Sequence, residues 1–420
     1  MFRRRQRWQF VTVMAVAFVV IAAQVILRGK LTAPTTAYNE QFRMARYLLH
    51  GTGFVCPVGP ERDDPSSWYS PGYIALMTVI MATFGEGTRA SLAVIRLVNI
   101  AAMSVSFGLY FLVAVRKFGP KVARVAVVLM LISPSLMFKA DEIWDTSWTM
   151  LGGALLLALF VVASPSRPPA VFGSGLACGA VAMVNPCFTL CYPVWVIYSW
   201  WRQRRAGQKI LSLLRYSGLV VMGFLLAILP WTVRNVYHFG ELFYLRGNLP
   251  LEMWSGNAPW SDGYFGSTRP DKPHPVFHES EARRMVELGE YGYFQACRAE
   301  VARWWQEDKG RFGRLTAWRI RWFWFGRYDF DMSRIALVVK MLGVAGSTIL
   351  AVFGAAVVIW KRREGLVLMT TLLVFPSPYI ITAIMVRYRL PIEPVMLLLG
   401  AIGLVQLWPK RKKTLQEKPP

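Results

Sequence analysis

Two stretches in the first polar segment of the chain, AYNEQFR at residues 37–43 and SWYSPGY at residues 67–73, decide how the fold is interpreted. The first places a carboxylate, Glu40, on a short amphipathic helix. The second is an aromatic and proline turn that leads into an apolar run at 73–84. That run has about a dozen residues, whereas roughly 20 are needed to cross a bilayer. We therefore expect residues 29–90 to form an external loop whose helices lie on the membrane.

The composition predicts an all-α polytopic membrane protein. The 420 residues are 55% hydrophobic and 17% charged, with a mean hydropathy of +0.36, whereas soluble chains carry roughly 25% charged residues. The first apolar run is longer than a signal peptide core and lacks a convincing cleavage site, which indicates a retained span. We expect about ten transmembrane helices, at residues 9–28, 91–115, 121–138, 147–164, 169–185, 187–201, 212–231, 334–360, 365–386 and 391–408.

The net charge of +24 raises the question of a nucleic-acid partner. The basic residues fall in short clusters beside apolar segments, which is the positive-inside pattern of membrane topology and not the continuous basic face of a nucleic-acid binder. We expect membrane lipids and no nucleic acid as partners, with both termini in the cytoplasm. The clusters lie at 3–7, 116–124, 202–209, 361–363 and 410–413.

This topology divides the chain into parts. A transmembrane catalytic module at 1–231 includes the first external loop, and a small external cap at 232–333 follows. The helices at 334–408 return to the membrane, and residues 409–420 form a basic cytoplasmic tail. Tryptophans in the cap are typical of a belt at the membrane interface, namely Trp304, Trp305, Trp318, Trp322 and Trp324.

Acidic residues at the outer ends of spans are candidates for chemistry, because charge is costly at the membrane. Glu40 is interpreted as a helix-capping residue, as one member of an i,i+3 pair with Arg43, or as a general base or metal ligand. The corner at 139–146 offers Glu142 and Asp145. Asp145 could cap the following helix, which would leave Glu142 for the site. The sequence does not separate these two acids.

Arginines at the same membrane face supply the complementary charge. A guanidinium fork matches phosphate oxygens, so these residues are candidates for binding a lipid phosphate. The alternative is that the side chains reach for lipid headgroups. The candidate substrate-binding residues are Arg96, Arg234, Asn235, Arg387 and Arg389.

Other kinds of site are disfavoured. The five cysteines include no C-x-x-C pair, although Cys56 and Cys297 would both be external and could form a disulfide. His274 and His278 have helical spacing, but Pro275 lies between them, which disfavours a metal site. No nucleotide-binding loop occurs in a credible context, so no nucleotide cofactor is expected.

A series of phrases along most of the chain resembles the polytopic GT-C glycosyltransferases. The likeness is to the bacterial relatives of the protein O-mannosyltransferases and aminoarabinose transferases. Each phrase is weak alone, and their order and spacing make the likeness specific. The phrases are ARYLLHGTGF at 45–54, WYSPGY at 68–73, RLVN at 96–99, RKFG at 116–119, IWDTS at 143–147, PWTVRN at 230–235, WSGNAP at 254–259 and RYRLPIEP at 387–394.

The resemblance implies roles for several residues. The family carries an aspartate in the first external loop that acts as base or helps to bind a metal. This sequence has no aspartate at that point, and Glu40 is the nearby acid. The second acid of the family maps onto Asp145 or onto Glu142. Tyr69 and the arginines near the seventh and ninth spans resemble substrate- and phosphate-binding positions.

The implied reaction is transfer of a sugar from a polyprenyl-phosphate donor to a lipid, glycan or protein acceptor. The base takes a proton from the acceptor hydroxyl, and arginines stabilise the departing lipid phosphate. The resemblance places the enzyme in a bacterial cytoplasmic membrane, with its site on the external face. It leaves open whether the reaction uses a divalent cation. The alternatives are a transporter or flippase, or a polymerase or ligase, of lipid-linked saccharides.

Overall fold

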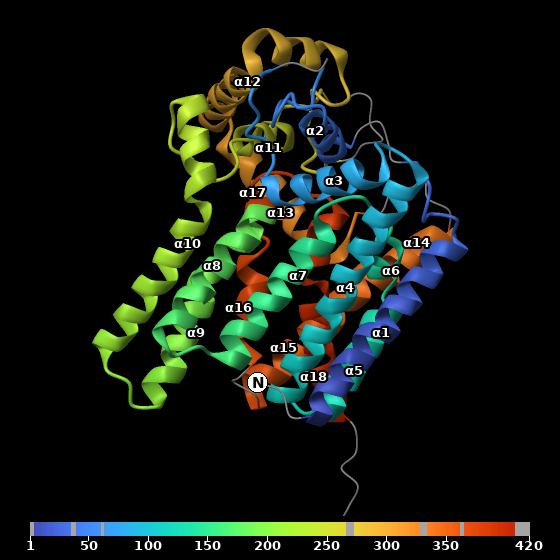
Figure 1. Ribbon diagram of the computed structural model, residues 1–420, viewed down its shortest axis with the longest axis vertical. Helices are drawn as coiled ribbons and strands as arrows, with labels where there is room; N and C mark the ends of the chain where they lie inside the picture. Colours follow the sequence, from blue (N-terminus) through green and yellow to red (C-terminus); the bar gives the residue numbers. More distant parts are fainter. Residues whose placement is uncertain are drawn as a thin grey trace, which may run out of the picture.

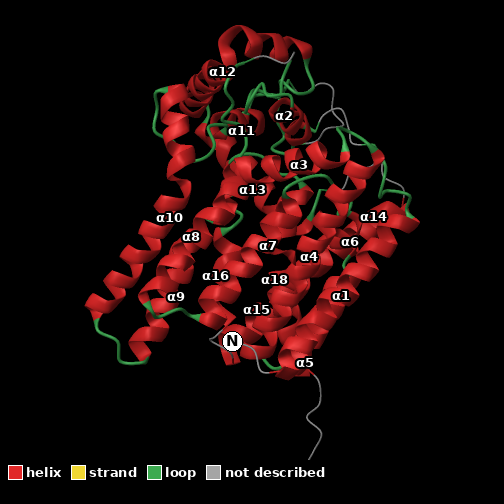
Figure 2. Cartoon of the chain, viewed as in Figure 1, coloured by secondary structure: helices red, strands yellow, loops and turns green. Residues whose placement is uncertain are grey.

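The structure is a computed structural model that describes residues 4–34, 39–59, 63–265, 273–327, 334–361 and 365–407. Figure 2 shows a chain made of helices and loops, and the described residues contain isolated bridges but no β-strand. The predicted all-α class is therefore confirmed. The predicted basic tail at 409–420 and the cluster at 410–413 lie outside the described residues.

The body of the molecule is a bundle of apolar helices whose long members run roughly along one direction (Figure 1). Six helical stretches are long and apolar enough to cross a membrane. Their outward faces are rich in exposed leucine, valine and isoleucine, as expected of surfaces in contact with lipid. They comprise α1 (Arg4–Leu27), α4 (Arg89–Lys117), α7 (Thr146–Leu157) with its π-helical extension Ala158–Ala163, α10 (Ile210–Phe239), α14 (Arg334–Met341) with α15 (Ser347–Lys361), and η5 (Val386–Ile392) with α18 (Glu393–Leu407).

The other four expected spans are present as shorter or interrupted helices, because proline breaks the helical hydrogen-bond pattern. Pro134 starts a new helix directly after Ser133, and Pro186 follows the extended Asn185. The ten expected spans are therefore present as six long stretches with shorter helices packed among them. The shorter helices are α5 (Pro120–Ile132), α6 (Pro134–Phe138), α8 (Pro168–Val184), α9 (Cys191–Arg205), α16 (Leu366–Val374) and α17 (Ser377–Ile381).

The first polar loop forms a platform of two helices at one end of the bundle. These are α2 (Glu40–Leu49) and α3 (Pro71–Phe84). Figure 1 shows α3 lying across the ends of the bundle helices. A helix of 14 residues is only about 21 Å long, so α3 is too short to cross the membrane, as predicted. Tyr73, Ile74 and Met77 on α3 pack with Phe42 and Met44 of α2 in one buried cluster.

A cap covers this end of the molecule (Figure 1); it is built from α11 (Leu249–Asn257), α12 (Glu279–Glu307) and the start of α13 (Lys309–Phe325), whose far end packs in the bundle core. Its core also contains residues of the first loop, among them Trp68. Trp304 packs in this core against Trp254, so its assignment to an interfacial belt is wrong, whereas Trp305 and Trp318 are exposed. Both Cys56 and Cys297 are buried there as free thiols, so the disulfide considered from the sequence is not formed.

Candidate active site

A cavity of about 490 Å³ lies where the bundle, the platform and the cap meet. Segments far apart in the sequence build its wall, including the turn before α3, the start of α7, the segment after α8 and the start of α11. Its polar lining combines carboxylates, guanidinium groups, amides and phenols. The residues that carry these groups are Gln41, Tyr69, Asp145, Asn185, Tyr244, Arg246, Asn248, Glu252, Tyr379, Arg387 and Tyr388.

Asp145 lies at the start of α7 and faces the cavity. Its side chain does not cap α7, contrary to the interpretation considered from the sequence. The carboxylate Oδ2 instead accepts a hydrogen bond of 2.8 Å from Asn185 Nδ2, and the backbone N–H donates to Gln41 Oε1 at 3.3 Å. Burial raises the pKa of Asp145, whereas Asn185 and the nearby guanidiniums of Arg246 and Arg387 oppose that shift.

Glu40 is the first residue of α2, and it lies behind the cavity wall. Asn39 caps the helix by accepting from the backbone N–H of Phe42 at 3.0 Å, so Glu40 is not needed as a cap. Its Oε2 atom is buried and has no hydrogen-bond partner among the described residues. Burial raises the pKa of Glu40 to about 7, although the charge of Arg387 opposes this. A carboxyl with such a pKa changes protonation state near neutral pH.

Glu142 lies apart from the cavity lining. It forms an ion pair with Lys139, and its second carboxylate oxygen is buried and meets no hydrogen-bond partner in the part of the chain that the structure describes. Its backbone carbonyl accepts from Asn99 Nδ2 at 3.1 Å, which anchors the corner before α7 to α4. Of the two acids that the sequence did not separate, Asp145 is the one that faces the cavity.

Arg387 and Tyr69 both line the cavity, as their candidate roles require. The Arg387 guanidinium lies over the ring of Trp144, 4.0 Å from its centroid. Tyr69 packs near the same Trp144 ring, with centroids 6.5 Å apart. The structure therefore brings these two predicted residues to the cavity that also contains Asp145.

Three other candidates lie outside the cavity lining and bind backbone carbonyls. Arg96 donates to Asp141 O at 3.0 Å and to Leu31 O at 2.9 Å, which joins α4 to two loops. Arg234 donates to Ser66 O at 2.7 Å and to Phe54 O at 3.1 Å. Asn235 donates to Leu245 O at 3.2 Å. In this structure these side chains hold loops in place.

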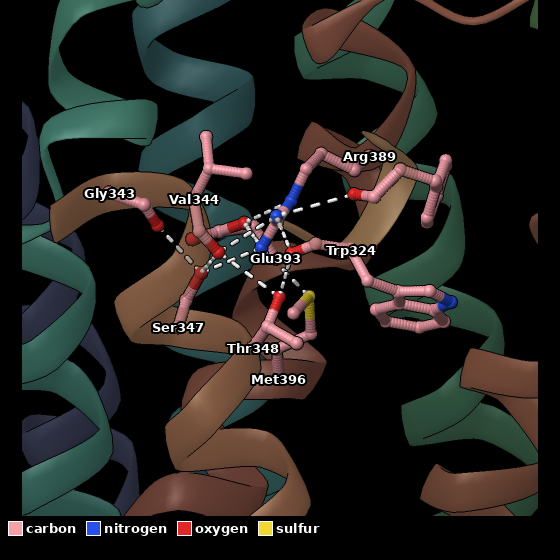
Figure 3. Close-up of polar contacts among 9 residues, drawn as sticks. Trp324, Gly343, Val344, Ser347, Thr348, Arg389, Glu393 and Met396 are labelled. Carbon is pink, nitrogen blue, oxygen red and sulfur yellow. Dashed lines mark hydrogen bonds and ion pairs between the residues drawn. The ribbon is translucent and has the colours of Figure 1, made fainter. Parts of the chain in front are cut away.

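Arg389 lies inside the bundle, away from the cavity lining, and Figure 3 shows its polar contacts. Its side chain is 1% exposed and forms an ion pair of 2.9 Å with Glu393, which is fully buried. The guanidinium also donates to Val344 O at 2.9 Å, Trp324 O at 3.0 Å and Ser347 Oγ at 2.7 Å. This network joins α13, α15 and α18 through buried polar groups.

The structure adds two charged cavity residues that the sequence did not indicate. Arg246 follows α10, and its Nε donates to Trp68 O at 2.8 Å while the guanidinium lies over the Tyr69 ring. Glu252 lies in the first turn of α11, and its Oε1 accepts from Asn248 Nδ2 at 3.0 Å. Burial raises the pKa of Glu252 against the charge of Arg246. The only sequence signal for this region was the nearby WSGNAP phrase at 254–259.

The described residues contain no group of three or more histidine, cysteine, aspartate or glutamate side chains that could hold a metal ion. His274 is buried against Phe265 and Phe277, and its Nδ1 accepts from the backbone N–H of Val276 at 3.2 Å. Burial lowers the pKa of His274 to about 3, so its ring is neutral. Its environment is that of a core side chain.

No family model and no curated protein matches the chain. Among solved structures, it is similar to archaeal oligosaccharyltransferase AglB from Archaeoglobus fulgidus, in complex with an inhibitory peptide and a dolichol-phosphate. That match has a TM-score of 0.50 and 12% identity, and covers 95% of this chain and 50% of that chain. The apo form of the A. fulgidus oligosaccharyltransferase gives a TM-score of 0.51 and 12% identity, and covers 94% and 50% of the two chains.

The fold is a GT-C glycosyltransferase fold. The resemblance expected from the sequence phrases is thus confirmed for the fold. ArnT from Cupriavidus metallidurans in the apo state also matches, with a TM-score of 0.36, 15% identity and coverage of 96% of this chain and 78% of that chain. This chain spans about half the length of the oligosaccharyltransferase chains that it matches.

Proposed function

We propose that this protein is an integral membrane glycosyltransferase that takes a sugar from a polyprenyl-phosphate-linked donor. The observation that carries the proposal is the cavity, where Asp145, Glu252, Arg246 and Arg387 meet at the junction of bundle and cap. The GT-C fold supports it, and the AglB structure of that fold holds a dolichol-phosphate and a peptide. An acceptor hydroxyl and a lipid phosphate need such a mixture of acids and arginines.

The donor phosphate would bind between the two guanidinium groups of Arg387 and Arg246, since arginine forks match phosphate oxygens. Apolar lining residues, among them Leu190, Leu249 and Ile381, would contact the first part of the carrier lipid. Glu252 and Asn185 would bind hydroxyl groups of the sugar. This arrangement uses no nucleotide, because the activating group of the donor is its own lipid phosphate.

Asp145 would act as the general base. The acceptor oxygen attacks the anomeric carbon of the sugar and forms the new glycosidic bond, while the bond to the lipid phosphate breaks. The acceptor proton moves to the Asp145 carboxylate, and the lipid phosphate leaves with the bonding electron pair, stabilised by Arg387 and Arg246. Glu40, behind the wall, would in its ionised form partly offset the positive field of Arg387, and Glu142 would act in the same direction.

The site would lie on the external side of a bacterial cytoplasmic membrane, with both termini in the cytoplasm. Three features support this orientation. α1 begins at the end of the bundle opposite the cap (Figure 1), and α4 also ends there with the basic pair Arg116 and Lys117. Basic residues favour the cytoplasmic side of a membrane. α9 likewise ends in a basic run, at 202–205.

Transfer of a whole oligosaccharide, instead of one sugar, is a second candidate, favoured by the likeness to an oligosaccharyltransferase. Mass spectrometry of envelope glycans and lipids, with the protein present and absent, tests both. An added mass of one sugar supports the first function, and an added chain supports the second. Translocation of a lipid-linked saccharide in proteoliposomes, without any glycosyl product, would contradict both and indicate a flippase.

A further inference from the structure

Residues 66–69, which we call the strap, run past the cavity and end at α3. Tyr69 at the end of the strap lines the cavity. The Arg246 guanidinium lies 4.8 Å from the centroid of the Tyr69 ring. The position of the strap therefore sets one wall of the cavity and the place of an arginine beside it.

A carboxylate of the cap holds the strap from the side away from the bundle. Glu290 on α12 is 2% exposed. Its Oε2 accepts from Ser66 Oγ at 2.7 Å, and its Oε1 accepts from Ser67 N at 2.5 Å and from Ser67 Oγ at 3.1 Å. One buried side chain thus satisfies three donors of the strap, and these donors would otherwise be buried without an acceptor.

The carbonyl oxygens of the strap are bound by other residues. Arg234 Nη1 donates to Ser66 O at 2.7 Å, Gly247 N donates to Ser67 O at 2.9 Å, and Arg246 Nε donates to Trp68 O at 2.8 Å. The contacts are complementary, because these groups bind backbone acceptors of the strap and Glu290 binds three of its donors. Among the polar contacts of the strap with described residues, those of Glu290 come from α12, which also packs Phe294 against Trp68, with ring centroids 5.8 Å apart.

The path of α12 is interrupted just before this carboxylate. Gly289 has φ 70° and ψ 161°, a backbone conformation that other residues rarely adopt. Glu290 consequently begins a second helical segment, and a carboxylate is favoured at such a helix start. The break thus places the carboxylate where α12 meets the strap.

We propose that Glu290 is a positioning residue through which the cap fixes Tyr69 and Arg246 at the cavity. The inference rests on the proposed function for its catalytic consequence, and on geometry alone for the position of the strap. Glu290 itself does not line the cavity. It would act on the reaction only through the strap.

The test compares Glu290→Ala with Glu281→Ala as a matched control. Glu281 is also a carboxylate of α12, but its partners Tyr293 and Arg284 both lie in the same helix. Two readouts are taken from detergent-purified full-length protein: kcat and KM for sugar transfer, and the rate at which N-ethylmaleimide alkylates Cys187. Cys187 lines the cavity, and the other four cysteines are buried.

Glu290→Ala is expected to lower kcat/KM by about tenfold or more, because small displacements of positioned groups are costly. It is also expected to raise the alkylation rate of Cys187 several-fold, while Glu281→Ala changes neither. Wild-type kinetics and alkylation in Glu290→Ala would overturn the proposal. Raised alkylation in a protein that shows no transfer in any variant would support the role of Glu290 and refute the proposed function.

A second set of variants guards against a general loss of folding. Glu290→Gln keeps an oxygen acceptor for the Ser67 N–H, so it should restore most of kcat/KM relative to Glu290→Ala. Ser66→Ala with Ser67→Ala should reproduce a large part of the Glu290→Ala defect, and the three changes together should lose little more. Additive losses would show that Glu290 acts independently of the strap and would overturn the proposal.

Discussion

Replacing Arg389 by methionine should destabilise the protein strongly, whereas replacing Arg387, two residues earlier, should not. Arg389 is 1% exposed and is paired with the fully buried Glu393. Methionine would leave the Glu393 carboxylate buried without its partner and would also remove the donors to Val344 O and Trp324 O. Arg387 instead faces the cavity.

Breaking a buried ion pair by removing one partner costs roughly 3–5 kcal/mol. That is a large part of the roughly 5–15 kcal/mol by which a typical domain is stable. Replacing both members of the pair by apolar side chains removes the unpaired charge, so Arg389→Met with Glu393→Leu should recover much of the loss. Arg387→Met should instead abolish most of the transfer at nearly wild-type stability.

The assay is thermal unfolding of the detergent-purified variants, followed by tryptophan fluorescence, together with sugar transfer. The midpoint should fall clearly for Arg389→Met, recover partly in the double variant, and stay near wild type for Arg387→Met. If Arg389→Met unfolded like the wild type but lost transfer, then Arg389 would bind substrate and the separation of the two arginines would be refuted.

Three further predictions follow from single sites. The folded-state pKa of Glu40 is raised to about 7, so the protonated carboxyl stabilises the folded protein at low pH. This stabilisation is lost as the pH rises from about 4.5, the ordinary value, through about 7. Over this pH range the thermal midpoint should therefore fall less in Glu40→Gln than in wild type. Asn185→Asp replaces the hydrogen-bond donor to Asp145 by a second carboxylate, so the pKa of Asp145 should rise. The acidic limb of the pH–rate profile should then move to higher pH, and an unmoved limb would contradict the role of Asp145 as base. A Cβ at Gly354 would lie 1.8 Å from Leu399 O, whereas one at Gly346 would meet no atom within 4 Å; Gly354→Ala should therefore lower the yield of folded protein in membranes and Gly346→Ala should not, as judged by gel filtration.

The sequence predicts the membrane bundle well because long apolar runs have a direct physical meaning. The span containing α4 and the short α3 follow from length and hydropathy. The interruptions at Ser133 and Pro186 were harder to predict, since proline is tolerated in membrane helices when neighbours satisfy the freed backbone groups. Whether such a run continues or breaks depends on packing with other helices.

The site is only partly predictable. Asp145 and Arg387 could be predicted because a charged residue at the end of a membrane span costs free energy, which indicates a functional role. Arg387 and Arg389 appeared equivalent in sequence, but they lie two residues apart on the 3-10 helix η5. With three residues per turn they point in different directions, one to the cavity and one into the bundle. Arg246 and Glu252 reach the cavity through tertiary packing of the cap, which local patterns do not reveal.

Release of polyprenyl phosphate by reconstituted protein tests the central claim most directly. Wild-type and Asp145→Asn proteins, inserted in vesicles with polyprenyl-phosphate sugars extracted from bacterial membranes and with an envelope lipid extract as acceptor, are compared by mass spectrometry. The account predicts that the wild type releases polyprenyl phosphate and forms a glycosylated product, and that Asp145→Asn does neither while remaining folded. Equal release by Asp145→Asn, or no release by the wild type, would contradict it.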